Sequence, residues 1–390
     1  MTPHRIGIIG YGGFGQFLHR AWATMDRVQV AAVADMDPGR NPGSPVRFYR
    51  QWEELTDDPG IDLVVIATPP FTHADMACEA MTRGKHVLIE KPMATSLENA
   101  RRIMDLRDKT GQVAGIDYML RFNPLVEALA SLTHSGVFGA LRRAVVENYA
   151  QDEILPPGHW FWDREISGGI LVEHGVHFFD LINSLTTATP KQVSGMAHGR
   201  NSCQEDQVLA TVVYDNGLMA THYHAFSRPG FFEHTSIRLV YDLAQLDLLG
   251  WIPLAGQVTA LVNEGTVKAL YDLPGFQEKE KVAIKDVPDL SRPEGWGERP
   301  LVLADGGEAV VVSGGCTYQV DTYITGTFAA AGTKGEVYRA SLQGLLADLI
   351  CKIEKPGHSL RVGLEEGLAS LELALQATTA ARTGVKCNRS

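Results

Sequence analysis

The chain has 390 residues, 45% of them hydrophobic, and its formal net charge is −11 at pH 7. This length predicts two domains, and the acidic balance disfavours nucleic acid and anionic membranes as partners, since both carry negative phosphates. No stretch of the sequence is apolar for long enough to span a bilayer. The five cysteines are scattered, with none in CxxC spacing, and the first predicted strand leaves no room for a secretory signal before it; we therefore expect reduced thiols and a cytoplasmic protein.

The N-terminal segment has the pattern of a dinucleotide-binding turn. An apolar run that begins near Arg5 leads into Gly10-Tyr11-Gly12-Gly13-Phe14-Gly15, and an amphipathic segment predicted as a helix follows. In such a turn the first glycine permits a tight bend, the second lets the backbone approach a pyrophosphate, and the third lets the helix pack on the strand. The residues predicted to bind the dinucleotide here are Gly10, Gly12, Gly13, Phe14 and Gly15.

A second predicted strand, residues 28–34, ends in Asp35. An acidic residue at this place can accept hydrogen bonds from the adenosine ribose, which favours NAD over NADP as the cofactor. Arg40 could weaken that preference by contacting a 2′-phosphate, although a solvated loop arginine is the more common case.

Two more apolar strands are predicted, at residues 61–67 and 86–90, and helices of similar length alternate with them. This alternation predicts a parallel sheet. The first of the two strands leads to Thr68 and Pro69, and His73 follows in a first helical turn, where it could touch the cofactor or lie at the surface. The second strand delivers Glu90-Lys91-Pro92. Because ligands collect at the carboxyl ends of such strands, Glu90 and Lys91 are predicted to face the cofactor, and Lys91 the substrate as well.

After residue 122 the pattern changes to a run of strands, with helices gathered near the end at 335–353 and 365–383. The tripeptide Asp215-Asn216-Gly217 between two such strands predicts a hairpin, because Asn and Gly tolerate positive φ. We therefore predict an α/β protein with a dinucleotide-binding domain at 1–122. An α+β domain with a large open, mainly antiparallel sheet is predicted at 123–390.

A predicted helix over residues 170–182 is apolar nearly all round and should be buried. Glu173, His177 and Asp180 have the spacing i, i+4, i+7 and share one stripe of it, so they are expected to enter one cleft. A histidine between two carboxylates can have the tautomer and pKa that a general base needs near neutral pH. The alternative is a polar seam between domains, but buried ionisable clusters favour active sites.

Glu173, His174 and His177 also suggest a trio of metal ligands. Their spacing is not that of HExxH, and three candidates on one helical turn rarely converge on one ion, so no metal site is predicted. Trp160 and Trp162 precede the helix and could stack on the C–H face of a sugar, whereas core packing is the commoner fate of tryptophan.

Together these motifs resemble the glucose–fructose oxidoreductase and inositol dehydrogenase family (Gfo/Idh/MocA). The resemblance covers nearly the whole chain and rests on the glycine-rich turn, the Thr-Pro-Pro turn with His73, Glu90-Lys91-Pro92, Arg121-Phe122-Asn123-Pro124, Gly168-Gly169 and the helix with His177 and Asp180. It implies a Rossmann domain and a C-terminal domain whose open sheet forms homodimers or homotetramers. It also implies NAD(P)-dependent hydride transfer at a carbinol of a sugar, anhydrosugar, glycoside or cyclitol.

By this resemblance, Lys91 and His177 are the catalytic pair. His177 is expected to remove the alcohol proton while Lys91 donates a hydrogen bond to the same oxygen, and Glu173 is expected to orient His177 or bind a neighbouring hydroxyl. The remaining residues expected at the substrate are Arg121, Trp160, Trp162 and Asp180. The family usually has an aspartate where this chain has Glu173, and the extra methylene puts in doubt which hydroxyl is attacked.

Two other functions share this fold. A protein that retains NAD could oxidise a sugar transiently, eliminate a substituent and reduce the product again, which makes it a glycosidase or lyase in net outcome. A non-catalytic member could sense NAD or sugar for a partner protein, and such a protein could dispense with Lys91 and His177. Their presence argues against it.

Overall fold

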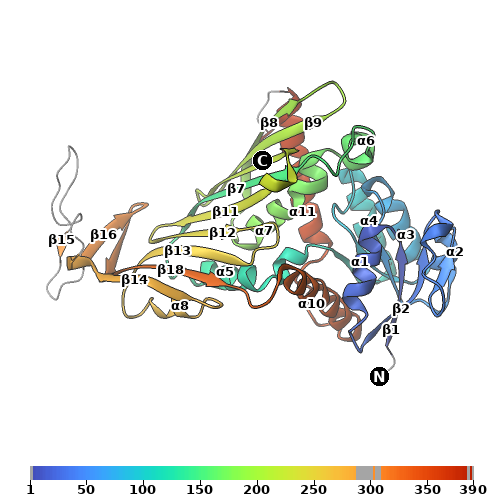
Figure 1. The fold of residues 1–390 in the computed structure, drawn as a ribbon, viewed down its shortest axis with the longest axis horizontal. Helices are drawn as coiled ribbons and strands as arrows, with labels where there is room; N and C mark the ends of the chain where they lie inside the picture. Colours follow the sequence, from blue (N-terminus) through green and yellow to red (C-terminus); the bar gives the residue numbers. More distant parts are fainter. Residues whose placement is uncertain (1–2, 287–301, 304–308, 384–386, 389–390) are drawn as a thin grey trace.

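The computed structural model describes residues 3–286, 302–303, 309–383 and 387–388. Its first sheet is parallel, with the strand order β3-β2-β1-β4-β5-β6, and it lies on the right of Figure 1. The strands are β1 His4–Ile9, β2 Val28–Ala34, β3 Arg47–Tyr49, β4 Leu63–Ile66, β5 His86–Ile89 and β6 Ala114–Ile116. The helices between them are α1 Gly13–Trp22, α2 Trp52–Asp57, α3 His73–Thr82 and α4 Leu97–Thr110.

This order explains where a ligand can bind. The chain leaves β1 towards β2 on one side and returns to β4 on the other, so the sheet has a topological switch point between β1 and β4. The connections on either side of such a point diverge and leave a crevice at the carboxyl ends of the strands. The strands themselves are continuous apolar runs, as in β4, where all four residues are buried, because helices cover both faces of a parallel sheet.

The second sheet has ten strands in the order β14-β18-β13-β12-β11-β7-β10-β9-β8-β19. It is mainly antiparallel, as predicted, but β7 and β10 run parallel. A smaller sheet joins β15, β16 and β17. The strands are β7 Leu141–Gln151, β8 Pro190–Gly199, β9 Glu205–Tyr214, β10 Met219–Arg228, β11 His234–Tyr241, β12 Ala244–Leu249, β13 Ala255–Val262, β14 Gln277–Ala283, β15 Val302–Leu303, β16 Ala309–Ser313, β17 Cys316–Val320, β18 Thr322–Ala329 and β19 Cys387–Asn388.

Burial alternates along the second sheet. In β9 every second residue is buried, because one face packs against helices α7 and α11 while the other stays open. The predicted hairpin at Asn216-Gly217 is confirmed: β9 pairs antiparallel with β10, and Gly217 has a φ of 87°. The helices of this part are α5 Pro124–Ser135, α6 Arg164–Ser167, α7 Val176–Ser184, α8 Lys268–Tyr271, α10 Lys334–Glu354 and α11 Leu364–Thr383.

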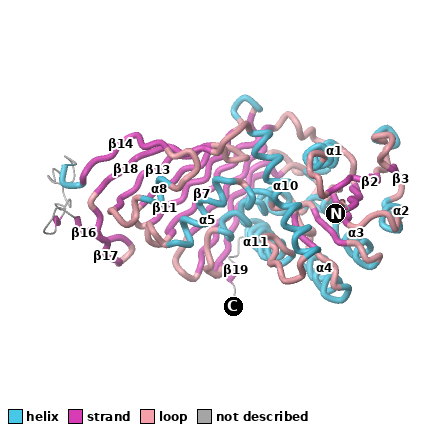
Figure 2. Tube along the Cα trace, turned by 90° about the horizontal axis from the view of Figure 1, so that it is seen from below, coloured by secondary structure: helices cyan, strands magenta, loops and turns pink. Residues whose placement is uncertain are grey.

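The two long C-terminal helices contact the N-terminal sheet's helices. Figure 2 shows α10 beside α1 and α11 near α4. The indole N–H of Trp22 donates to the carbonyl of Leu342 at 3.2 Å, and the Gln343 amide donates to the carbonyl of Ala21 at 2.7 Å. These contacts join the parts that carry the two sheets. The domain boundary at residue 122 stays a prediction.

The helix predicted over 170–182 differs from expectation at its start. Residues Leu171–Gly175 form a π-helical turn, η5, before α7 begins at Val176. A π turn is wider than an α turn and is frequently found at functional sites. The strands that were not predicted are β3, β6, β8, β14, β15, β17, β18 and β19. Among the helices that the structure describes, none is both long and apolar enough to cross a bilayer.

Candidate active site

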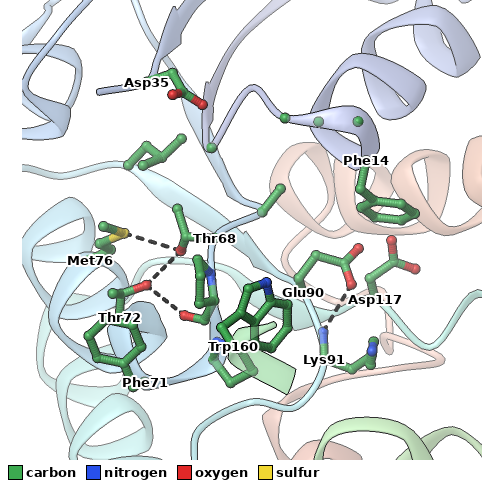
Figure 3. A pocket seen from close by; sticks show the side chains of 18 of the residues that line it. Phe14, Asp35, Thr68, Phe71, Thr72, Met76, Glu90, Lys91, Asp117 and Trp160 are labelled. Carbon is green, nitrogen blue, oxygen red and sulfur yellow. Dashed lines mark hydrogen bonds between the residues drawn. The ribbon is translucent and has the colours of Figure 1, made fainter. Parts of the chain in front are cut away.

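A cavity of about 1070 Å³ lies at the carboxyl ends of the first sheet. Its walls come from the turns that follow β1, β2, β4, β5 and β6, and from η5 and the start of α7 on the side of the second sheet. Figure 3 shows part of it, with Asp35 at one end and Glu90, Lys91 and Asp117 at the other. The cavity therefore spans the crevice that the strand order predicts.

The glycine-rich turn forms one wall, and Gly10, Gly12, Gly13, Phe14 and Gly15 all line the cavity. Gly10 has a φ of 90°, and a Cβ there would lie 2.4 Å from the carbonyl oxygen of Ala67. A Cβ on Gly15 would lie 2.1 Å from the carbonyl oxygen of Gly10. Side chains at either place would therefore push the helix and the neighbouring strand apart. Around Gly13 a Cβ would meet no described atom within 4 Å, so the turn is open towards the cavity.

Asp35 lies at the end of β2 and is held by three donors. Its carboxylate accepts from the backbone N–H of Tyr11 at 2.8 Å, from that of Asp37 at 2.9 Å, and from Nη1 of Arg40 at 2.9 Å. Arg40, expected as a solvated loop residue, is about half exposed and lines the cavity together with Asp35. An acid and a base thus lie next to each other at the end of the cavity away from Lys91.

Thr68 and Pro69 line the cavity, but His73 does not. His73 is fully buried; its Nδ1 lies 2.7 Å from the carbonyl oxygen of Pro92 and its Nε2 lies 2.8 Å from that of Thr68. Burial lowers the pKa of His73. The expectation that it touches the cofactor is wrong, because both ring nitrogens are turned inward. His73 instead joins the turn after β4 to the turn that carries Lys91.

Lys91 projects into the cavity and is paired with Glu173 of the π turn. Its Nζ lies 2.6 Å from Oε1 of Glu173 and 3.0 Å from the Glu173 backbone carbonyl oxygen. Both side chains are mostly buried, with 15% and 13% of their surface exposed. An ammonium group has three N–H donors, so two are engaged by Glu173 and one remains for a ligand.

His177 lines the same cavity from α7 and is buried. Its Nδ1 has no hydrogen-bond partner among the described residues, and its ring lies among those of Trp251, Tyr118 and His174, with centroids 4.8, 6.1 and 6.3 Å away. Burial first, and then the positive charge of Lys91, hold the pKa of His177 well below its usual range. The imidazole is therefore neutral at pH 7.

The expected arrangement of His177 between two carboxylates is wrong. Glu173 pairs with Lys91, and Asp180 pairs with Arg121, whose Nε and Nη2 donate to the two carboxylate oxygens at 2.8 and 2.7 Å. Asp180 is fully buried, and neither it nor Arg121 lines the cavity. The prediction that these two residues bind substrate is thus corrected: their bidentate pair connects α7 to the segment after β6.

The two tryptophans before the π turn have different places. Trp160 lines the cavity and is drawn beside Lys91 in Figure 3. Trp162 is buried outside it, and its indole N–H lies 3.1 and 3.2 Å from the carbonyl oxygens of Leu155 and Pro156. The expectation that Trp162 contacts substrate is therefore wrong, because its polar atom and its ring are both used in packing.

Several residues of the cavity were not predicted as part of it. His174 was considered only as a metal ligand; burial lowers its pKa to about 3, and it lines the cavity with His177. Three others come from segments far apart in the sequence, at Asp117, Trp251 and Tyr338. Asp117 had a signal that could have found it, since it follows the short apolar strand β6, which was not predicted, as Glu90 follows β5. Trp251 and Tyr338 had none.

Comparison with known proteins agrees with this geometry. Residues 4–118 match the model of the oxidoreductase family with an NAD-binding Rossmann fold. Residues 126–241 match that of the GFO/IDH/MocA C-terminal domain. The chain is 33% identical over 193 residues to the rhizopine catabolism protein MocA of Rhizobium meliloti, which is 49% of this chain and 59% of the relative. It is 32% identical over 227 residues to scyllo-inositol 2-dehydrogenase (NAD(+)) of Bacillus subtilis, which is 55% of this chain and 64% of the relative.

Both matches thus span about three fifths of the relatives' own length. The fold extends further. The WlbA dehydrogenase from Bordetella pertussis, solved in complex with NADH and UDP-GlcNAcA, has a TM-score of 0.73 at 17% identity and covers 100% of this chain and 98% of its own. Because the two family matches together cover more than half of the sequence and lie on the two sheets described above, the chain belongs to the Gfo/Idh/MocA oxidoreductase family.

Proposed function

We propose that this protein transfers hydride between NAD and a secondary alcohol of a sugar, anhydrosugar, glycoside or cyclitol. The observation that carries the proposal is that Lys91 and His177 line the same cavity as the glycine-rich turn. A dinucleotide laid along that turn would end where the two side chains are. The relatives named for dehydrogenases of inositols and nucleotide sugars support this class of substrate.

The cavity fits a dinucleotide. Its volume of about 1070 Å³ is at the upper end of ordinary ligand pockets, as a dinucleotide and a substrate together require. The turn is open at Gly13, at the N-terminus of α1, where backbone N–H groups and the helix dipole favour phosphates. When bound, the nicotinamide supplies or accepts the hydride.

Asp35 favours NAD over NADP. Its carboxylate lies at the end of β2, where it can accept hydrogen bonds from the hydroxyls of the adenosine ribose, and it would repel a 2′-phosphate. Arg40 offers a cation at the same place, which could bind a 2′-phosphate. Its ion pair with Asp35 engages that cation and offsets its charge. The preference is therefore expected to depend on this pair.

His177 is the base in this mechanism. Because its pKa is lowered, the ring is neutral before substrate arrives and can accept a proton without first losing one. Its Nδ1 is buried, so Nε2 is the nitrogen that would accept the hydroxyl proton, with the N–H of the neutral ring on Nδ1. The hydroxyl proton passes to His177 while the carbon that carries the hydroxyl group gives up its hydride.

Lys91 stabilises the negative charge that develops on the alcohol oxygen. Its third N–H is the one not held by Glu173, and an N–H donor fixed in a mostly buried place stabilises an oxyanion more than water does. Glu173 acts on the substrate through Lys91, by fixing the position of the ammonium group. Trp160 offers an aromatic face for the C–H side of a sugar ring.

We also propose a cytoplasmic enzyme that assembles into homodimers or homotetramers through the open face of the second sheet. The free cysteines Cys78, Cys203, Cys316 and Cys351 support a reducing compartment. On the open face, residues between the buried ones are only half exposed in β9 and include Leu209 and Val213, which suits burial against a second copy.

The test is an assay of NADH fluorescence with a panel of monosaccharides, anhydrosugars, glycosides and cyclitols, run with NAD and with NADP. We expect NADH to form with at least one member of the panel and NAD to be preferred. A complete blank from folded protein that binds NAD would contradict the proposal.

A further inference from the structure

Two carboxyl groups, Glu90 and Asp117, lie next to each other at the inner end of the cavity. They follow the neighbouring parallel strands β5 and β6, which brings their side chains to the same edge of the sheet. Only 8% and 2% of their surface is exposed, and both line the cavity. Figure 3 shows the two carboxyl groups side by side, between Phe14 and Lys91.

The protein leaves three of their four carboxyl oxygens without a hydrogen-bond donor. Oε1 of Glu90 and both oxygens of Asp117 have no partner among the described residues. The fourth, Oε2 of Glu90, accepts from the backbone N–H of Lys91 at 3.2 Å. A buried pair with a purely structural role would be satisfied by protein donors, since an unpaired buried polar group is costly. Both residues line the cavity, where a bound ligand can reach them.

Two carboxylates this close and this buried cannot both ionise. Burial raises the pKa of both, and the pKa of Glu90 is raised well above its usual range because it also faces Asp117. One proton is therefore kept by the pair, with Glu90 as the group that holds it more strongly. The other groups that act on the pair are the ammonium of Lys91, the hydroxyl of Tyr338 on α10, and the backbone amide of Met119.

The single charge left on the pair is not compensated nearby. The ammonium of Lys91 is already matched by the carboxylate of Glu173 at 2.6 Å, and His174 and His177 are neutral at pH 7 because their pKa values are lowered. The charges of Asp35 and Arg40 lie at the other end of the cavity and pair with each other. Among the described residues that line the inner end, the net charge is thus about −1.

This charge lies where the proposed function places the nicotinamide. If the adenosine ribose is at Asp35 and the phosphates are at the glycine-rich turn, the nicotinamide ring reaches the ends of β4, β5 and β6, beside Lys91. We propose that Glu90 and Asp117 share one proton, and that the remaining negative charge makes the cavity bind the oxidised, cationic nicotinamide more tightly than the reduced, neutral one.

The consequence is a bias in the direction of reaction. At equal nucleotide concentrations, a cofactor site that prefers NAD⁺ to NADH is loaded with NAD⁺ and releases NADH readily, which favours turnover in the direction of alcohol oxidation. The same preference lowers the reduction potential of the bound nucleotide, and the equilibrium of the overall reaction is unchanged. A unit charge close to the bound ring, in a partly buried site, would change the ratio of the two dissociation constants by roughly ten- to hundredfold. For a two-electron couple, each tenfold change in this ratio corresponds to about 30 mV in the potential of the bound nucleotide.

The experiment measures two dissociation constants, that of NADH by its fluorescence and that of NAD⁺ by calorimetry. Their ratio is compared between the full-length protein and three variants of it. In Glu90→Gln the amide N–H replaces the shared proton, so Asp117 stays charged and the ratio of the two constants should stay within about threefold of the wild type. The double variant Glu90→Gln/Asp117→Asn is uncharged and should lose roughly ten- to hundredfold of the preference for NAD⁺. The control Glu98→Gln/Asp105→Asn removes two exposed carboxylates from α4, the helix between β5 and β6. It should keep the wild-type ratio of the two dissociation constants.

The outcomes separate cleanly. A structural defect would weaken both nucleotides alike and leave the ratio unchanged, and an unchanged ratio in the double variant overturns the inference. If Glu90→Gln alone lost the preference for NAD⁺ as far as the double variant does, the assignment of the proton to Glu90 would be wrong. The inference rests on the proposed function, and if the wild-type protein bound neither nucleotide, that function would fail as well.

Discussion

Nζ of Lys91 lies 2.6 Å from the carboxylate of Glu173 and 3.0 Å from the backbone carbonyl of the same residue. One residue therefore fixes two of the three donors of the lysine. The π turn, Leu171–Gly175, makes this possible because it brings the side chain and the carbonyl of Glu173 to one point at the edge of the cavity.

Replacing Glu173 with Gln should reduce kcat about 10- to 100-fold, since the amide holds the ammonium group less firmly and removes its counter-charge. Glu173→Asp keeps the charge but moves it back by one methylene, and should retain more activity than Glu173→Gln. The dissociation constant of NAD should change less than about threefold in both variants. The measurement is steady-state kinetics together with NAD titration. If Glu173→Gln kept full kcat, Glu173 would have no positioning role.

Asp35→Ser should shift the cofactor preference towards NADP. The substitution removes the carboxylate that repels a 2′-phosphate and frees Arg40 to bind it, so the ratio of kcat/KM for NAD to that for NADP should fall by roughly 10- to 100-fold. Asp37→Ser is the matched control, because Asp37 also lies near Arg40, at 3.5 Å, but its side chain is exposed. An unchanged ratio in Asp35→Ser would place the adenosine ribose elsewhere.

His73→Ala should lower the free energy of unfolding by about 1–3 kcal/mol. The neutral ring has one N–H donor, and its loss leaves one of the two facing carbonyl groups, of Thr68 or Pro92, without a partner in the interior. The substitution should also lower kcat, since the turn that carries Lys91 loses its connection to the turn after β4. Urea unfolding and steady-state kinetics measure the two effects. Thr82→Ala, on the exposed end of the same helix, is a control that should change neither property much. Full stability of His73→Ala would show that the two contacts do not matter.

The protein should lose stability in mild acid. Four buried histidines, His73, His177, His222 and His224, and the partly buried His174 have lowered pKa values because burial disfavours the charged ring. Above pH ~6.5 they are neutral in both the folded and the unfolded chain. Below it the unfolded chain binds protons that the folded protein does not, so the free energy of unfolding falls with pH, by up to about 1.4 kcal/mol per pH unit for each histidine.

Urea unfolding between pH 5 and pH 8 tests this. His222 packs against Phe179, with ring centroids 4.3 Å apart, and it does not line the cavity. In His222→Leu the slope below pH ~6.5 should be smaller by about one proton, that is, by about 1.4 kcal/mol per pH unit. Equal slopes for the variant and the wild type would show that His222 is protonated in the folded protein.

The sequence predicted the parts of the site that local patterns encode. Gly10 and Gly15 were predicted as close-packing positions because the turn between a strand and a helix needs them, and Lys91 was placed in the cavity because strand ends of a parallel sheet collect ligands. The pattern could not tell that Asp180 pairs with Arg121. That pair depends on how α7 meets a segment about sixty residues earlier in the chain, which helical spacing does not contain.

The roles of Trp162 and His73 were also beyond the sequence. Both lie within two residues of one that lines the cavity, and only the structure shows that their ring nitrogens face backbone carbonyl oxygens in the interior. Asp117 and Trp251 come to the cavity through the arrangement of β6 and of the loop after β12, each of which has an ordinary sequence of its own.

The central claim is that His177 takes the proton of the alcohol that gives up hydride. The most direct measurement is the single-turnover rate of NADH formation, followed by stopped-flow fluorescence with a substrate from the panel, in the wild type and in His177→Ala. The account predicts a rate lower by about 10²- to 10⁴-fold in the variant, with the dissociation constant of NAD nearly unchanged. A variant that forms NADH at the wild-type rate, or that no longer binds NAD, would contradict it.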